Sequence, residues 1–152
     1  MISAADVEYH HPPDADHTYA ETNWFCFNIP EERLLGIIYT VSRKGVPAIS
    51  YDVAIYGALV ENRAESLYFD SQQMLPAPQR LSKYTLPTGL SVEAVNPPRD
   101  YRVDYVGYDS CEIHFDFKGL MDPFDIHDPN HSPKAAATTA EQHAGAGMGS
   151  GY

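Results

Sequence analysis

Residues 112–116 carry three titratable side chains at alternate positions. Glu112, His114 and Asp116 occupy every second position of this segment. Because successive side chains of a β-strand point to opposite faces, these three would share one face, about 7 Å apart. Carboxyl and imidazole groups exchange protons, so in a cavity that excludes solvent they could protonate an alkene or direct a water molecule. The spacing therefore indicates a candidate acid–base group.

Two neighbouring segments predict the pair of strands that would carry this group. Residues 101–105 and residues 111–117 both alternate apolar with charged side chains. A register that pairs Tyr105 with Cys111 keeps the two apolar sets on one face and leaves residues 106–110 as the connection. We therefore predict an antiparallel pair whose charged residues lie on the opposite face.

This register assembles a candidate catalytic site. It places Arg102 opposite His114 and Asp104 opposite Glu112. We take Asp104, His114 and Asp116 as the candidate catalytic residues. The alternative is the ordinary solvent-exposed face of a half-buried sheet, in which Arg102 neutralises its acidic neighbours. The two interpretations differ in whether the acids are buried.

The other residues that could bind a metal or act in catalysis do not form a recognisable motif. Metal-ligating residue types occur near the start of the chain, at His10, His11, Asp14, Asp16 and His17. Their spacing offers no framework that would fix a tetrahedral metal site. The sequence also contains no Ser/His/Asp nucleophile signature, no glycine-rich phosphate loop and no Cys-x-x-Cys pair. We therefore predict no metal site and no cofactor.

The chain is rich in aromatic side chains that suit a ligand pocket. It contains 11 tyrosines and 1 tryptophan. Such rings offer an apolar wall together with a hydroxyl or indole donor. The alternative is ordinary core and cross-strand packing, which favours the same residues. The predicted ligand-binding residues are Trp24, Tyr39, Tyr51, Tyr56 and Tyr105.

Residues 23–41 predict an antiparallel hairpin with two apolar faces. Pairing Ile29 with Leu34 sets the register of the whole hairpin. The resulting pairs are Phe27 with Gly36, Phe25 with Ile38, Trp24 with Tyr39, and Cys26 with Ile37. A hairpin with one solvent-exposed face alternates apolar and polar residues. This hairpin is apolar on both faces, so both faces must be buried against something. We expect a barrel interior or ligand on one side and a partner layer on the other.

The remaining segments predict an all-β fold. Residues 48–56 alternate in character like a strand that is wet on one side. Further strands are predicted at residues 66–74, 83–86 and 90–94, the last two joined by the turn at residues 87–89. About seven short strands favour an antiparallel lipocalin-like barrel or sandwich. We prefer the barrel, because its mouth can hold one small apolar molecule.

Composition restricts the class of partner. The 152 residues suit one domain, and 21 acidic against 10 basic residues give a formal charge of −11. This charge opposes nucleic acid and anionic lipid, so a neutral or apolar small molecule is the expected ligand. Cys26 and Cys111 read as buried free thiols of a cytoplasmic protein. No segment has the length of a membrane span, and the first residues show no basic flank followed by an apolar run, so we expect neither membrane insertion nor secretion.

The chain divides into three segments of different amino-acid composition. Residues 1–22 predict a flexible polar arm, residues 23–133 a β domain, and residues 134–152 an Ala/Gly-rich linker or tail. A linker suggests that a further segment follows it. We therefore expect the chain to be the front part of a larger protein.

Several sequence blocks resemble a known family. The blocks are Glu-Thr-Asn-Trp-Phe-Cys-Phe at residues 21–27, Pro-Glu-Glu-Arg-Leu at 30–34, Tyr-Thr-Leu-Pro-Thr-Gly-Leu at 84–90, Tyr-Arg-Val-Asp-Tyr at 101–105, and Met-Asp-Pro-Phe-Asp at 121–125. Together they resemble the N-terminal half of the AttH-like, carotenoid 1,2-hydratase-like proteins, which are lipocalin-related. The Asp-His-x-Trp-Gly type motif of the second half is absent here. The resemblance therefore implies that this chain corresponds to only the first of the two β halves of such a protein.

The resemblance implies a hydrophobic substrate and a missing partner. The expected function is binding of an isoprenoid- or polyketide-like molecule by the N-terminal half of a hydratase-type lyase. A second β half, or another subunit, would cover the first hairpin. The alternative is a noncatalytic lipocalin-like carrier or interaction module. The two differ in whether the chain supplies a buried acid.

Overall fold

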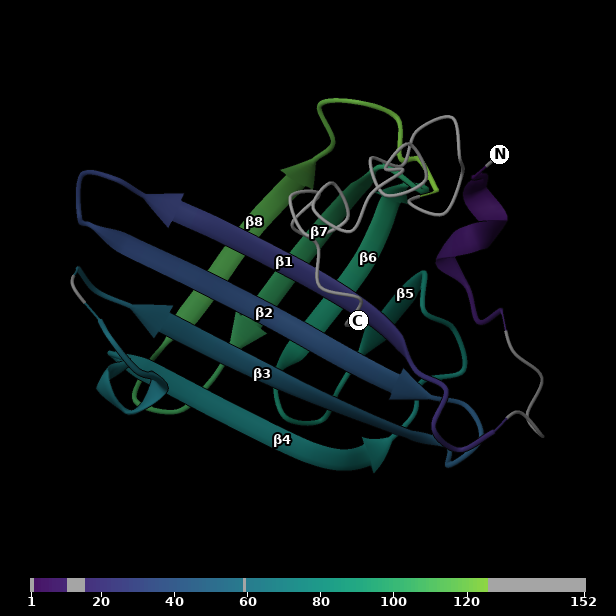
Figure 1. Cartoon of the computed structure of the whole chain (residues 1–152), viewed down its shortest axis with the longest axis horizontal. Coiled ribbons are helices and arrows are strands. Elements are labelled where there is room, and N and C mark those ends of the chain that lie inside the picture. Colours follow the sequence, from purple (N-terminus) through teal and green to yellow (C-terminus); the bar gives the residue numbers. More distant parts are fainter. Residues whose placement is uncertain (1, 11–15, 59, 126–152) are drawn as a thin grey trace, which may run out of the picture.

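The computed structural model describes residues 2–10, 16–58 and 60–125, and the regular secondary structure of this part of the chain is almost entirely β-strand (Figure 1). The strands are β1 (Glu21–Ile29), β2 (Leu34–Arg43), β3 (Ala48–Tyr56), β4 (Tyr68–Pro76), β5 (Lys83–Thr85), β6 (Leu90–Asn96), β7 (Asp100–Val106) and β8 (Glu112–Lys118). Two short 3₁₀ helices, η1 (Ala4–Val7) and η2 (Arg63–Glu65), complete the described elements. The predicted all-β class is confirmed.

The strands form two antiparallel sheets. The first sheet has the order β1-β2-β3-β4, and the second has the order β5-β6-β7-β8. In Figure 1 the strands of the first sheet run across those of the second at a steep angle. No strand pairing joins the two sheets within the described residues, so a single closed barrel is not confirmed.

The first hairpin has the predicted register. Ile29 pairs with Leu34, Phe27 with Gly36, and the pairing continues to Glu21 with Ser42. The turn between the strands is short, and its backbone bends through Arg33, which has a φ of 54°. The short turn at residues 30–33 sets this register, because in a hairpin the loop length fixes which residues pair.

The last hairpin differs from the predicted register by two residues. Tyr105 pairs with Ile113 rather than with Cys111. The Gly107 amide instead donates to the Cys111 carbonyl at 2.9 Å, which leaves a turn of three residues. Asp109 lies in this turn with a φ of 52°, a conformation that Asp tolerates. A shift of two residues keeps every side chain on its face, so alternation alone could not choose between the registers.

The core lies between the sheets. The inner face of the first sheet contributes Phe25, Ile38 and Val53, and that of the second contributes Val92 and Val103. Aromatic rings bridge the layers at the edge strands, where Phe25 of β1 lies 6.5 Å from Phe115 of β8 between ring centroids. Each fully buried large apolar side chain contributes about 1.5–3 kcal/mol. This packing holds the two sheets face to face.

Part of the segment predicted as a flexible arm packs against the sheets. The Glu8 carboxylate accepts hydrogen bonds from the Leu81 amide at 2.8 Å and from Arg80 Nε at 3.0 Å. The Tyr9 hydroxyl lies 2.8 Å from the Ser42 hydroxyl and donates to the Pro78 carbonyl at 3.0 Å. Glu8 and Tyr9 therefore contact the β domain, and the flexibility of the arm stays a prediction. Residues 134–152, the predicted tail, lie outside the described residues.

Neither described helix has the length and apolar character that a membrane-spanning helix requires.

Candidate functional site

The predicted catalytic residues lie on the outer face of the second sheet. His114 Nδ1 is 2.7 Å from Asp104 Oδ1, its cross-strand partner, and His114 Nε2 is 3.4 Å from Glu112 Oε2. Arg102 Nε donates to Asp116 at 3.0 Å, so Arg102 faces Asp116 and not His114 as predicted. The side chain of His114 is 52% exposed, and Asp104 and Asp116 are similarly open. These acids are therefore not excluded from solvent.

The charge environment of His114 follows from this contact. The hydrogen bond to Asp104, and then that to Glu112, raises the pKa of His114 above its ordinary value. Lys83 and Glu93 form another ion pair on the same outer face, with Nζ and Oε1 2.8 Å apart. Such alternating pairs are typical of a solvated sheet face. The geometry matches the exposed-face alternative rather than a catalytic pocket.

Two of the predicted ligand-binding residues lie in the interior. The hydroxyls of Tyr51 and Tyr105 both donate to Asp70 Oδ2, at 3.2 and 2.7 Å. Gln72 donates to Asp70 Oδ1 at 2.7 Å, and the Tyr68 hydroxyl lies 2.6 Å from that of Tyr105. Asp70 is only 8% exposed. A buried carboxylate therefore has several hydrogen-bond donors, as burial of a charge requires.

This interior network changes the titration of its phenols. Burial, assisted by the nearby Asp70 charge, raises the pKa of Tyr51 to about 12. Burial, together with hydrogen bonds to Tyr68 and Asp70, also raises the pKa of Tyr105. Asp70 acts here as an acceptor of hydrogen bonds. The network therefore joins the sheets and does not offer a proton donor at an open site.

Sequence reasoning missed Asp70. It continues the inward-facing row of Phe25, Ile38 and Val53, where an apolar residue is expected. That mismatch between an apolar row and an acidic residue is the signal that could have found it. The tyrosines that hold it come from β3 and β7, and their meeting depends on how the sheets pack. Local alternation does not contain that information.

The other predicted ligand-binding residues gather on the outer face of the first sheet. A hollow of about 290 Å³ lies there, which we call the aromatic hollow. Its lining residues are Trp24, Ile37, Tyr39, Asp52, Ala54, Tyr56 and Arg63. The rings of Trp24 and Tyr39 meet at a tilt of 59°, with centroids 5.5 Å apart. The structure thus divides the five predicted residues between an outer hollow and an interior network.

One ion pair forms the polar part of the aromatic hollow. Arg63 Nη2 lies 2.8 Å from Asp52 Oδ2, and the Arg63 guanidinium also lies 4.1 Å above the centre of the Phe69 ring. Asp52 Oδ1 is buried, yet it has no hydrogen-bond partner in the part of the chain that the structure describes. Asp52 pairs with Tyr39 across the strands, which places the carboxylate beside an aromatic wall. The hollow therefore combines aromatic rings with an incompletely satisfied carboxylate.

The apolar face extends beyond the hollow. Trp24 is 56% exposed, and Leu35 is also exposed. Cys26 lies on this face as an exposed free thiol, so the prediction that it is buried is wrong. The second sheet covers the inner face of the hairpin, and the predicted cover of the other face stays a prediction. Its outer apolar face stays open over much of its area.

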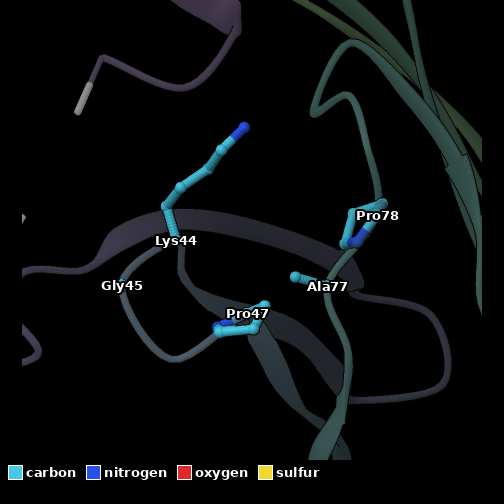
Figure 2. A pocket seen from close by; sticks show the side chains of 5 residues that line it. All are labelled: Lys44, Gly45, Pro47, Ala77 and Pro78. Carbon is cyan, nitrogen blue, oxygen red and sulfur yellow. The ribbon is translucent and has the colours of Figure 1, made fainter. Parts of the chain in front are cut away.

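A second hollow lies at one end of the first sheet, where the β2–β3 turn meets the chain after β4 (Figure 2). It measures about 320 Å³ and is lined by Lys44, Gly45, Pro47, Ala77 and Pro78. Figure 2 shows the Lys44 side chain extending away from Pro47. Its Nζ lies 4.3 Å from the centre of the Tyr9 ring. This hollow contributes a contact for the N-terminal segment and no group suited to catalysis.

The described residues contain no group of three His, Cys, Asp or Glu side chains arranged to hold a metal ion. Of the N-terminal residues of metal-ligating type, His11 and Asp14 lie outside the described residues.

Comparison with known proteins gives no family. The chain matches no family model, no curated protein and no solved structure. The resemblance to the AttH-like, carotenoid 1,2-hydratase-like proteins therefore stays a prediction. Function has to be argued from the geometry of the chain itself.

Proposed function

We propose that this chain is a lipocalin-like binding domain for small apolar molecules, with the aromatic hollow as its binding site. The observation that carries the proposal is the hollow itself, formed by Trp24, Tyr39 and Tyr56 on an open sheet face. Aromatic walls with a few polar groups are typical of small-molecule sites. The interior differs, because the hydroxyls of Tyr51 and Tyr105 are already engaged with Asp70.

The contrast between the two outer faces supports this choice. The second sheet presents ion pairs such as Lys83–Glu93 and Arg102–Asp116. The first sheet presents Trp24 and Leu35 to solvent. Contiguous exposed apolar surface is uncommon on a monomeric protein and marks binding surfaces. A ligand that covers this face would remove it from water.

Titration of the chain with geraniol, a small isoprenoid alcohol, tests the proposal. Trp24 is the only tryptophan, so its fluorescence reports directly on the hollow. We expect a saturable change in that fluorescence. Ala54→Leu adds a side chain to the wall of the hollow and should weaken binding, whereas Ala64→Leu adds the same side chain to the exposed helix η2 outside it. Equal binding by the two folded variants would contradict the proposed site.

A second candidate function is the N-terminal half of a hydratase-type lyase. The open apolar face of the first hairpin favours it, because a second β half would bury Trp24 and Leu35. The candidate acids Asp104, His114 and Asp116 lie open to solvent. We therefore expect the chain alone to add no water to an isoprenoid alkene. Mass spectrometry of the alkene after incubation checks this, and formation of an alcohol would favour the enzyme.

A further inference from the structure

We infer that the aromatic hollow selects an organic ammonium ion, one that joins an apolar group to a positively charged nitrogen. This inference rests on the proposed function and names the class of ligand. Its basis is a carboxylate, Asp52, set into a wall of aromatic rings. Neither a neutral hydrocarbon nor an acid would use both features.

The aromatic rings are the first part of the argument. Trp24 and Tyr39 stand at an angle with their centroids 5.5 Å apart, and Tyr56 lines the same hollow. The face of an aromatic ring carries negative potential, so it attracts a cation that lies over it. A tilted pair of rings presents such potential from two directions. The apolar remainder of the ligand would contact Ile37 and Ala54.

The carboxylate is the second part. Asp52 Oδ1 is buried without a hydrogen-bond partner among the described residues, while Oδ2 receives Arg63. An unsatisfied buried acceptor is costly, and a donor that reaches it recovers that cost. An ammonium N–H group is a donor and also a counter-charge. A small movement of the Arg63 side chain would suffice to share the carboxylate, because this side chain is 55% exposed.

The charge of the chain is the third part. A formal charge of −11 attracts cations and repels anions over distances of about a Debye length, roughly 8–10 Å. Arg63 is the opposing group, since its guanidinium lies in the same hollow. However, Arg63 is held by Asp52 on one side and by the Phe69 ring on the other. It therefore competes with a cationic ligand for Asp52 rather than recruiting an anion.

Three probes of equal length test the inference: 3-phenylpropylammonium, 3-phenylpropyltrimethylammonium and the neutral alcohol 3-phenylpropanol. We expect the primary ammonium to bind about five- to tenfold more tightly than the alcohol, the size expected for one cation–π contact and one exposed ion pair. Added salt should reduce that difference. The trimethylated probe separates charge from hydrogen bonding, and weaker binding than the primary ammonium would assign part of the preference to N–H donation.

Two variants assign the preference to residues. Asp52→Asn keeps the shape of the side chain and should reduce the ammonium preference to the smaller part that the aromatic rings supply. Arg63→Gln removes the competing cation and should raise the affinity for the ammonium ion relative to that for the alcohol. Far-ultraviolet circular dichroism checks that both variants fold. If Asp52→Asn does not fold, the Arg63→Gln variant and the comparison of probes still test whether the hollow prefers an ammonium ion.

The outcomes separate the inference from the proposed function. Equal affinity for the ammonium ion and the alcohol would overturn the inference and leave the proposed function standing. An ammonium preference that is undiminished in Asp52→Asn, or that falls in Arg63→Gln, would also overturn it. Absence of binding by every probe and by geraniol would overturn both.

Discussion

The Tyr105 hydroxyl on β7 donates a 2.7 Å hydrogen bond to Asp70 on β4 and thereby joins the two sheets through the core. Tyr51 on β3 donates to the same carboxylate oxygen at 3.2 Å. No strand pairing connects the sheets within the described residues, so hydrogen bonds and packing of side chains help to hold them face to face. The Asp70 carboxylate is thus a buried polar link between the two sheets.

Replacing Tyr105 with Phe should destabilise the fold. The change removes a donor from a buried carboxylate, which typically costs about 1.5–3 kcal/mol. Urea denaturation measures the loss as a lower free energy of unfolding. Tyr101→Phe is the matched control, because Tyr101 lies on the same strand and its hydroxyl has no hydrogen bond within the described residues. Equal losses in the two variants would show that the link to Asp70 contributes nothing.

Stability should fall steeply in alkaline solution. Burial raises the pKa of Tyr51 and of Tyr84 from 10.0 to about 12. Folding therefore favours the neutral phenol, and its contribution is complete below the unfolded pKa and lost as pH rises from 10 to about 12. Urea unfolding over this pH range checks the loss, and Tyr84→Phe should make the decline shallower. An unchanged slope in that variant would contradict the role of Tyr84.

The first hairpin could be predicted in detail because its faces and its turn agree. Phe25 opposite Ile38 and Trp24 opposite Tyr39 follow from the pairing of Ile29 with Leu34. The last hairpin carries no comparable restraint, since a shift of two residues preserves both faces. Its register depends on the turn conformation at Asp109, which the strand pattern does not encode. Sequence patterns therefore specify faces more securely than they specify registers.

The candidate site could be predicted by residue type but not by location. Tyr51 and Tyr56 lie five positions apart on β3, so alternation already places them on opposite faces. Which face is open depends on the packing of the second sheet. Asp52 lies between them in sequence on the outer face, where its contacts with Arg63 depend on the loop between β3 and β4. For this reason the sequence pattern alone did not predict the ion pair between Asp52 and Arg63 in the aromatic hollow.

Gly36→Ala should destabilise the first sheet. A Cβ at position 36 would lie 2.0 Å from Cζ of Phe27, its cross-strand partner, which is far inside van der Waals contact. The Phe27 ring also contacts Phe115 on the second sheet, at 5.6 Å between centroids, so it has little room to retreat. We expect a loss of about 1–3 kcal/mol, the usual cost of overpacking, measured by urea denaturation.

A double-mutant cycle isolates the cause of that loss. Phe27→Leu removes the ring atoms that the new Cβ would meet, so Gly36→Ala should cost less in its presence than in the parent. Additive losses in the cycle would indicate that Gly36 is needed for its backbone rather than for the ring of Phe27.

The contact between His114 and Asp104 predicts a pH-dependent surface. The hydrogen bond to Asp104, followed by that to Glu112, raises the pKa of His114 above 6.5. Protonated His114 therefore stabilises the fold at pH below its ordinary pKa, and this contribution is lost as pH rises through the raised value. An NMR titration of the His114 ring should show the raised pKa in the parent. Asp104→Asn should return it toward 6.5, whereas Asp116→Asn, which removes a charge paired with Arg102 on the same face, should change it less. A parent His114 pKa at or below 6.5 would mean that the 2.7 Å contact with Asp104 does not form in solution.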